Sequence, residues 1–382
     1  MRLHPVDLLG CPVRVAIWSS LGRIGHYSTG VGKHILRMSI GLAELPNVDT
    51  SLVFSSDLWL ADSVRAHQSE MDVLKAIRLP LPRRALEALW RTIQAPSVDR
   101  WLDSADWLYC PKELYVPVRN TRLAVTVHDL YRFEPAYQKF SGYSTLPFRI
   151  AVRKAVQEAN LVLAVSEFTK TRLIELLGVP ANKIRVVGNG VDDAFFDLTP
   201  PPLGVQSLFA FPYVLAVGGI THKKGGNALL AVVDQLHRIA PELRVVVTGP
   251  VDAEFSSAVT SAKNLISIPR GFPDAKMQEL VASASVSLVL SEYEGFGIPA
   301  IEAMAAGVPV IAAQRASLPE VVGDGGLLVN PLNSVAVADT IADLQKDSTH
   351  RSALIARGRQ RAERFRWQGC VSRLCNALSD FT

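Results

Sequence analysis

Short apolar runs that are rich in β-branched residues alternate with longer amphipathic stretches along the whole chain. These runs predict strands at residues 13–18, 51–54, 123–127, 161–165 and 184–187, and then at 213–217, 243–248, 265–268, 286–290, 308–312 and 326–329. Nearly continuous apolar strands that are separated by helical segments are typical of parallel sheets with both faces covered. The pattern therefore predicts the α/β class, with doubly wound, Rossmann-like sheets.

A proline-rich segment interrupts this pattern near the middle of the chain. Residues 199–204 read Thr-Pro-Pro-Pro-Leu-Gly, which cannot continue a helix and disfavours a central strand. We therefore expect one domain over residues 1–198 and a second over residues 205–370. Residues 371–382 are expected to form a C-terminal helix that could pack back on the first domain. Because ligands bind beyond the C-terminal ends of parallel strands, the two domains are expected to face each other across a cleft.

The composition is that of a globular protein, with 382 residues of which 48% are apolar and 20% charged. No apolar stretch approaches the ~20 residues that span a bilayer, and prolines interrupt the N-terminal region where a secretion signal needs an apolar core. Residues 1–195 hold 24 Lys and Arg against 19 Asp and Glu, an excess too small to indicate nucleic-acid binding. We therefore expect a cytoplasmic protein without a nucleic-acid partner.

Two lysines lie in a glycine-rich turn after the first strand of the second domain. Lys223 and Lys224 follow Gly219, and the next helix is expected to begin near Asn227. Ammonium groups supply charge and the backbone amides of a helix start supply direction, a combination that suits a phosphate group. A solvated basic turn is the alternative, but the position directly after a strand favours the phosphate site.

Two places in the first domain also carry candidate chemistry after a predicted strand. Gly30 and Gly32 precede a helix predicted over residues 33–43, and glycine lets the backbone approach a ligand closely. Their spacing matches neither the dinucleotide-binding fingerprint nor a P-loop, so a flexible turn is the alternative. His128 directly follows the strand at residues 123–127. Its side chain either faces the cleft or caps the strand by bonding to backbone.

The strongest chemical signal lies in residues 291–304, which follow a predicted strand and lead into a helix. Glu294 is expected in the loop and Glu302 on the helix, while Gly295 and Gly297 expose backbone N–H groups at the helix start. Carboxylates accept hydrogen bonds from sugar hydroxyls, and amides donate to anions. This loop can therefore bind a ligand that carries both hydroxyl and phosphate groups.

At these residues the chain resembles the retaining glycosyltransferases of the GT-B fold, in particular family 4 (glycosyl transferases group 1). The most specific likeness is the pattern Glu, seven residues, Glu from Glu294 to Glu302, with its Gly-Phe-Gly core. Further similar segments are residues 29–33, 126–129, 165–169, 188–192, 305–310, 318–322 and 325–331. The resemblance covers nearly the whole chain. It implies two Rossmann-like domains and retaining transfer of a sugar from a nucleoside-diphosphate donor.

The resemblance also implies roles for the candidate residues. The catalytic residues it implies are His128, Lys224 and Glu294, and the donor-binding residues are Gly30, Gly32, Lys223, Lys224, Arg270, Gly271, Phe272, Glu294, Gly295, Phe296, Gly297 and Glu302. The lysines would hold the diphosphate, Glu302 the ribose hydroxyls, and Glu294 the hydroxyls of the sugar. Residues 270–272 would flank the base, and His128 would contact the transferred sugar. Family members usually work without a metal ion, and no other cofactor is implied.

One position departs from the family pattern. Family members often carry an arginine where this chain has Gly219, and a subgroup instead supplies two cations from the next turn, which Lys223 and Lys224 fit. A catalytically silent sugar-nucleotide-binding or scaffold protein of the same fold is therefore the alternative function. A nucleotide-sugar epimerase is a third hypothesis. A nicotinamide dehydrogenase is disfavoured because the full glycine fingerprint is missing.

The acceptor is the partner that the sequence defines least. Details around residues 126–130 look most like transferases for bacterial surface polysaccharides such as lipopolysaccharide, which are often mannosyltransferases. This likeness points to mannose from GDP-mannose, and to a glycan or a lipid-linked oligosaccharide as acceptor. Residues 73–93 hold five basic residues and one acidic residue among apolar ones. They could touch the cytoplasmic face of the inner membrane, but we favour an amphipathic helix that packs on the first domain.

Overall fold

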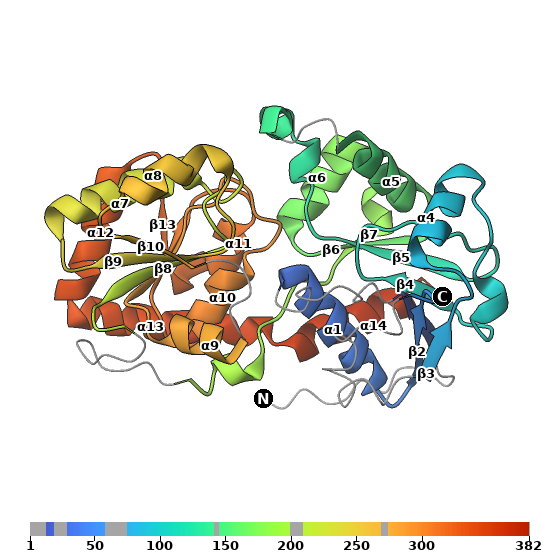
Figure 1. Cartoon of the computed structure of the whole chain (residues 1–382). Helices are drawn as coiled ribbons and strands as arrows, with labels where there is room; N and C mark the ends of the chain where they lie inside the picture. Colours follow the sequence, from blue (N-terminus) through green and yellow to red (C-terminus); the bar gives the residue numbers. More distant parts are fainter. Residues whose placement is uncertain are drawn as a thin grey trace.

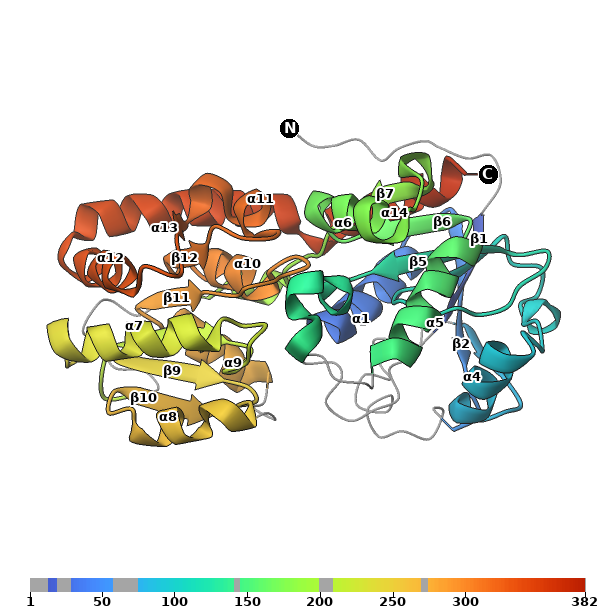
Figure 2. The same cartoon turned by 90° about the horizontal axis from the view of Figure 1, so that it is seen from above.

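The computed structural model describes residues 13–18, 29–57, 75–140, 145–198, 209–268 and 274–381. These residues form two parallel sheets, each with helices on both faces (Figures 1 and 2). The predicted α/β class with doubly wound sheets is therefore confirmed. The apolar strands are buried because both of their faces are covered, which explains their nearly continuous hydrophobic sequences.

The first sheet has the strand order β3-β2-β1-β4-β5-β6-β7. Its strands are β1 (Val13–Trp18), β2 (Val48–Phe54), β3 (Lys75–Arg78), β4 (Trp107–Cys110), β5 (Arg122–Val127), β6 (Leu161–Ala164) and β7 (Ile184–Val186), and its helices are α1 (Gly30–Ala43), α4 (Arg83–Thr92), α5 (Thr145–Glu158) and α6 (Glu167–Leu177). The five predicted strands of this half are confirmed within a few residues. β3 and β4 were not predicted, because β3 is a largely polar edge strand and β4 contains no β-branched residue.

The second sheet has the order β10-β9-β8-β11-β12-β13. Its strands are β8 (Tyr213–Val217), β9 (Arg244–Thr248), β10 (Leu265–Ile268), β11 (Val286–Val289), β12 (Val310–Ala313) and β13 (Leu327–Val329). Its helices are α7 (Gly226–Ile239), α8 (Ser256–Ser261), α9 (Asp274–Ala282), α10 (Ile298–Ala305), α11 (Leu318–Val322), α12 (Ser334–Lys346) and α13 (Ser348–Ala362). All six predicted strands of this half are confirmed, with small shifts at their ends.

Eight short 3-10 helices lie between these elements in the described ranges. They are η1 (Asp99–Trp101), η2 (Tyr131–Phe133), η3 (Pro135–Phe140), η4 (Ala181–Lys183), η5 (Asp193–Phe195), η6 (Ala253–Phe255), η7 (Gly323–Gly325) and η8 (Glu363–Phe365). Two of them, η5 and η8, lie in the segments that connect the two domains.

The last helix, α14 (Trp367–Ser379), returns to the first sheet (Figure 2). Its apolar face carries Trp367, Cys370, Val371 and Leu374, which are buried in the same hydrophobic cluster as the inner face of α1. Their spacing of three or four residues places them on one side of the helix. The helix starts at Trp367, earlier than the expected boundary at residue 371, and it packs on the first domain although the second domain precedes it in the chain.

The two connections between the domains run side by side. The backbone N–H of Val191 donates to the carbonyl oxygen of Phe365 over 2.8 Å. Asp192 accepts hydrogen bonds from Arg37 on α1 and from the indole N–H of Trp367. A Cβ atom at Gly190 would lie 2.4 Å from the Trp367 ring, so only glycine fits beside the tryptophan. The paired connections therefore fix where α14 crosses from one domain to the other.

Residues 73–93 do not form a single amphipathic helix, since their described part contains β3 and then α4. The apolar side chains of Leu79, Leu86 and Trp90 are buried in the core of the first domain, and the Trp90 ring lies 5.2 Å from that of Trp18. This burial supports the packed-helix interpretation and leaves mainly the cations of α4 at the surface. In the described part of the chain, no helix combines the length and the apolar character needed to cross a membrane.

Candidate active site

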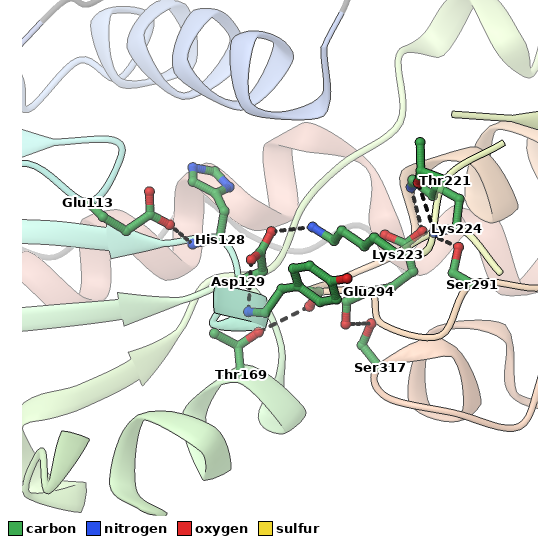
Figure 3. Close-up of polar contacts among 12 residues, drawn as sticks. Glu113, His128, Asp129, Thr169, Thr221, Lys223, Lys224, Ser291, Glu294 and Ser317 are labelled. Carbon is green, nitrogen blue, oxygen red and sulfur yellow. Dashed lines mark hydrogen bonds and ion pairs between the residues drawn. The ribbon is translucent and has the colours of Figure 1, made fainter. Parts of the chain in front are cut away.

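The candidate site lies where the C-terminal ends of the two sheets meet. β5 of the first domain leads directly into His128, β8 of the second leads into the turn with Lys223 and Lys224, and β11 leads into the loop with Glu294. Figure 3 shows Lys223 reaching Asp129, which follows His128, while Lys224 lies beside Glu294 in the second domain. The geometry of parallel sheets thus brings together residues that are far apart in the sequence.

The two lysines stand in a tight turn that begins at Thr221. The backbone N–H of Lys224 donates to both oxygens of Thr221, and Gly225 adopts a left-handed conformation with φ of 72°. The Lys224 ammonium group lies 2.6 Å from Oε1 of Glu294, and that of Lys223 lies 2.6 Å from Oδ2 of Asp129. Both cations therefore point toward the domain boundary, as a phosphate site requires.

Two glycines before this turn make room for it. A Cβ atom at Gly218 would lie 2.7 Å from Cε of Lys224, so the lysine stem passes directly over this glycine. Gly219 has a φ of 92°, and its Cβ atom would lie 2.0 Å from the carbonyl oxygen of Pro250. An arginine cannot occupy position 219 in this backbone conformation, because Pro250 blocks the start of any side chain. The departure from the family pattern therefore has a steric cause, and the cations come from the next turn instead.

Glu294 is buried and held from several sides. Its Oε1 atom accepts hydrogen bonds from Lys224 and from the Ser291 hydroxyl, the latter over 2.7 Å. Ser317 donates to the backbone carbonyl oxygen of Glu294 over 2.9 Å. Burial by itself would raise the pKa of Glu294, but the charges of Lys224 and Lys223 and the hydrogen bonds outweigh it, so this pKa lies below its ordinary value. Glu294 is therefore a fixed carboxylate at neutral pH.

Glu302 on α10 pairs with Lys33 on α1, so this ion pair joins the two domains. The side chain of Thr29 caps α1 by accepting from the backbone N–H of Gly32 over 3.0 Å, which explains why the helix begins at Gly30 rather than at Lys33. A Cβ atom at Gly30 would meet the tip of the Ile298 side chain at 2.9 Å. The N-terminus of α1 thus lies against the N-terminus of α10, and both helix starts present N–H groups to the boundary.

His128 is fixed through its ring and through its backbone. The ring nitrogen Nε2 lies 2.9 Å from the carbonyl oxygen of Pro111, and the backbone N–H donates to the carboxylate of Glu113. The carbonyl oxygen of His128 faces the second domain, where a Cβ atom at Gly295 would lie only 1.8 Å from it. The strand-cap and cleft-facing interpretations both describe part of this residue, because its ring bonds backbone while its carbonyl group faces Gly295.

Asp129 carries a second ion pair between the domains, with Lys223. It also accepts a hydrogen bond from the backbone N–H of Tyr131 over 3.1 Å, which is the loop-bracing role that aspartate often has after a strand. Burial opposes ionisation, but the ammonium group of Lys223 outweighs it and holds the pKa of Asp129 below its ordinary value. The pair therefore stays charged at neutral pH.

Family profiles match both halves of the chain. The family described as Glycosyltransferase Family 4 matches residues 28–195, and the one described as Glycosyl transferases group 1 matches residues 210–361. The alpha-maltose-1-phosphate synthase of Mycolicibacterium smegmatis is 30% identical over 273 residues, which cover 64% of this chain and 69% of that one. The chain belongs to glycosyltransferase family 4.

Two further comparisons agree with this assignment. The O-antigen chain mannosyltransferase B of Escherichia coli is 29% identical over 320 residues, which cover 80% of this chain and 79% of the relative. The crystal structure of HepE from Anabaena in complex with UDP and glucose superimposes with a TM-score of 0.70 at 18% identity, and the match covers 96% of this chain and all of that one (100%). The protein is a glycosyltransferase, and its two Rossmann-like domains have the GT-B fold.

Some expected site residues of the glycosyltransferase do not point a side chain at this boundary. Phe296 is buried in the core of the second domain with its ring 5.5 Å from that of Phe365, and its carbonyl oxygen already accepts a hydrogen bond from Ser317. Its side chain therefore serves packing rather than donor binding. Gly297 has a φ of 109° and forms the N-cap of α10. Arg270, Gly271 and Phe272 lie outside the described residues.

Other residues at the boundary were not anticipated. Lys33 and Asp129 each follow a motif residue, but their partners come from the other domain and no local pattern reveals them. Thr169 donates to the carbonyl oxygen of Gly295 over 3.2 Å. Glu320 on α11 accepts from two backbone N–H groups at the start of α6, at 3.0 and 3.2 Å. A carboxylate at a helix N-terminus is favourable, so this contact holds the domains together on a second side.

The described residues contain no group of three His, Cys, Asp or Glu side chains arranged to hold a metal ion. Asp192 and Asp193, the adjacent acids of the connection between domains, are engaged with basic or indole groups instead. Asp193 pairs with Arg366, and Asp192 accepts from Arg37 and Trp367. These acids therefore shape the connection.

Glu294→Gln should destabilise the glycosyltransferase in a pH-dependent manner. The depressed pKa means that the carboxylate stabilises the fold above its unfolded pKa of about 4.3 and that this contribution is lost as the pH falls through the folded pKa. We expect a loss of about 1–3 kcal/mol in the free energy of unfolding at neutral pH, shrinking below about pH 4. Urea unfolding of the wild type and of Glu294→Gln over this pH range measures the difference in the free energy of unfolding. The exposed Glu242→Gln serves as control, and a difference that does not change with pH would contradict the account.

Proposed function

We propose that this glycosyltransferase moves a hexose, with mannose as the first candidate, from a nucleoside-diphosphate sugar to a glycan or lipid-linked oligosaccharide, with retention of configuration. The observation that carries the proposal is the meeting of Lys223, Lys224, Glu294 and Glu302 at the start of α10, between the two sheets. The HepE structure is a complex with UDP and glucose, and the Escherichia coli relative is an O-antigen chain mannosyltransferase. These names support a nucleotide-sugar donor, mannose and an acceptor in surface polysaccharide synthesis.

The charges at the boundary fit a diphosphate leaving group. Breaking the bond between the anomeric carbon and the phosphate leaves negative charge on the diphosphate, and Lys223 and Lys224 are held within reach of that boundary. In the donor-free arrangement their ammonium groups pair with Asp129 and Glu294. A donor phosphate would take over these ammonium groups, and preorganised cations of this kind stabilise the developing charge without further rearrangement.

Two carboxylates can then bind hydroxyl groups: Glu294, which Lys224 releases, and Glu302, whose partner is Lys33. Glu302 lies on α10 at the second domain and fits the ribose, while Glu294 lies nearer to the His128 backbone and fits the transferred sugar. The carbonyl oxygen of His128 is directed at Gly295 and provides a partial negative charge close to that sugar. Such a dipole favours the positive charge that grows on the sugar ring. Glu294 is assigned to the sugar hydroxyls and also accepts from Ser291, so we do not assign it as a covalent nucleophile and favour attack on the same face as departure.

The main argument for a catalytically silent scaffold, the glycine at position 219, no longer holds. Gly219 suggested it, because an arginine is expected there, but Pro250 explains the glycine and two lysines supply the charge. The named relatives are transferases or synthases. We therefore retain transfer as the proposed function.

Lys224→Ala and Glu302→Ala should each lose most of the transfer activity while remaining folded. Removing one preorganised donor such as Lys224 typically lowers the rate by roughly 10²–10³-fold, and Glu302→Ala removes the acceptor proposed for the ribose hydroxyls. The measurement is sugar transfer from a panel of nucleotide sugars, paired with thermal shifts, because a ligand that binds the native state raises its melting temperature. One nucleoside diphosphate should stabilise the wild type and fail to stabilise Lys224→Ala. Lys276→Ala, an exposed lysine on α9, is the matched control, and wild-type turnover in either site variant would contradict the proposal.

His128→Ala should lower turnover more than donor affinity, because the ring that bonds Pro111 fixes the backbone whose carbonyl oxygen is proposed to act at the sugar and not at the nucleotide. Steady-state kinetics with titration of the donor by calorimetry separate the two quantities. His350→Ala, which changes an exposed histidine on α13, controls for the loss of an imidazole. Equal losses of turnover and of donor affinity would argue against a role at the sugar.

A lipid-linked acceptor would bring the enzyme to the cytoplasmic face of the membrane. The described part of residues 73–93 presents the exposed cations Arg84 and Arg91 on α4, and we propose them as the contact with anionic headgroups. Flotation with anionic vesicles should show binding that weakens at high salt and in Arg84→Glu/Arg91→Glu, while neutral vesicles serve as control. No binding to anionic vesicles would remove the membrane contact and leave a soluble glycan as the acceptor.

A further inference from the structure

A buried histidine lies behind His128. His34 on α1 is fully buried, at 0% exposure, although it follows Lys33 of the site directly. Its Nδ1 atom lies 2.7 Å from Oδ1 of Asn189, and its Nε2 atom lies 3.1 Å from the hydroxyl of Tyr109. The Tyr109 hydroxyl in turn lies 3.0 Å from that of Thr126. His34 thus links α1 to β4, to β5 and to the loop that follows β7.

These contacts place a proton on Nδ1 of the ring. A carboxamide oxygen can only accept, so Nδ1 of His34 carries the proton that it donates to Asn189. The Nε2 atom can then accept from Tyr109, whose oxygen accepts from Thr126. Every polar atom in this series of hydrogen bonds has a partner when the imidazole is neutral. In a protonated imidazole Nε2 would also donate, and the Tyr109 hydroxyl would then accept from it and donate to Thr126.

The ring of His34 is packed against the ring of His128. The two centroids are 4.8 Å apart and the planes are almost perpendicular, at 88°. On another side the ring lies 6.1 Å from that of Trp367, where α14 begins. The Nε2–H of His128 donates to Pro111, which fixes one edge of that ring, and His34 provides a second constraint. The orientation of His128 therefore depends on His34.

Burial holds the pKa of His34 well below its ordinary value, and repulsion from His128 lowers this pKa further. The hydrogen bond to Asn189 opposes the shift. The groups that face the ring are Tyr109 from β4, His128 after β5, Asn189 after β7 and Trp367 from α14. None of these four carries a carboxylate that could pair with a charged ring. Full burial without such a partner therefore favours the neutral state, which the hydrogen bonds also satisfy.

We propose that His34 is a positioning residue for sugar transfer. As a neutral imidazole held between Asn189 and Tyr109, it fixes the His128 ring and adds no positive charge of its own near the reacting sugar. This inference rests on the proposed function of His128. Positive charge grows on the sugar in the transition state, so a charged His34 behind His128 would oppose the reaction. The role of His34 is therefore both steric and electrostatic.

Two substitutions separate these contributions. His34→Gln keeps one donor for Asn189 and one acceptor for Tyr109 but removes the ring behind His128. We expect kcat to fall by about tenfold to a hundredfold while the donor dissociation constant stays within about twofold, because misplacement of a catalytic group affects turnover first. Asn189→Asp places a carboxylate beside Nδ1 and should charge His34, which moves the acid limb of the kcat–pH profile up by about one pH unit or more.

The double variant His34→Gln/Asn189→Asp tests the cause of that shift. Glutamine does not titrate, so the acid limb should return to its wild-type position. Asn376→Asp, the same chemical change at an exposed position of α14, should not move the profile. Nitrogen-15 NMR of the imidazole provides a readout without activity: we expect a neutral ring with Nδ1–H in the wild type at neutral pH, and a charged ring in Asn189→Asp.

The outcomes distinguish this inference from the proposed function. A wild-type enzyme that transfers sugar, with His34→Gln turning over at the wild-type rate, would overturn the positioning role alone. A charged His34, or one with its proton on Nε2, would also overturn it. A wild type without transfer from any nucleotide sugar would overturn the proposed function and this inference with it.

Discussion

Lysine and carboxylate side chains pair across the boundary between the two domains, in a place where neither partner is fully hydrated. Lys33 pairs with Glu302 and Lys223 with Asp129 from opposite domains, and Lys224 pairs with Glu294 within the second. Leaving any one of these charges without its partner would be costly, because desolvation is no longer compensated. The pairs therefore keep both sets of ligand groups in place and electrically balanced before a donor arrives.

Glycine at a few positions allows this arrangement of charges. Gly295 brings the second domain against the carbonyl oxygen of His128, and Gly218 lets the Lys224 stem pass toward the boundary. Pro250 excludes a side chain at Gly219 and so explains why the cations come from the following turn. Backbone occupies the volume that a side chain would need at Gly295 and Gly219, and the Lys224 side chain occupies it at Gly218. The chemistry of the site thus depends on how closely the two backbones approach one another.

The hydrophobic pattern was sufficient to predict most of the fold, because buried parallel strands are apolar on both faces and therefore visible in sequence. It missed β3, a polar edge strand, and β4, which contains no β-branched residue. Lys223, Lys224, Glu294 and Glu302 could be predicted because each lies after a strand or at a helix start. Asp129 and Lys33 could not be assigned their partners, which come from the other domain.

The role of His34 could not be predicted from the sequence for a similar reason. Its partners Tyr109, His128 and Asn189 come from separate elements, and one buried histidine on a helix has no distinctive local sequence. Phe296 is the opposite case. The motif that contains it suggests contact with the donor, but its ring packs in the core. Sequence motifs therefore pointed to the candidate site, and tertiary packing determines which side chains face the domain boundary.

The most direct test of the central claim is a crystal structure of the protein with the nucleoside diphosphate that stabilises it. We predict that the diphosphate lies between Lys223, Lys224 and the start of α10, that the ribose hydroxyls contact Glu302, and that the lysines have left Asp129 and Glu294. A nucleotide bound elsewhere, with all three ion pairs intact, would contradict the account.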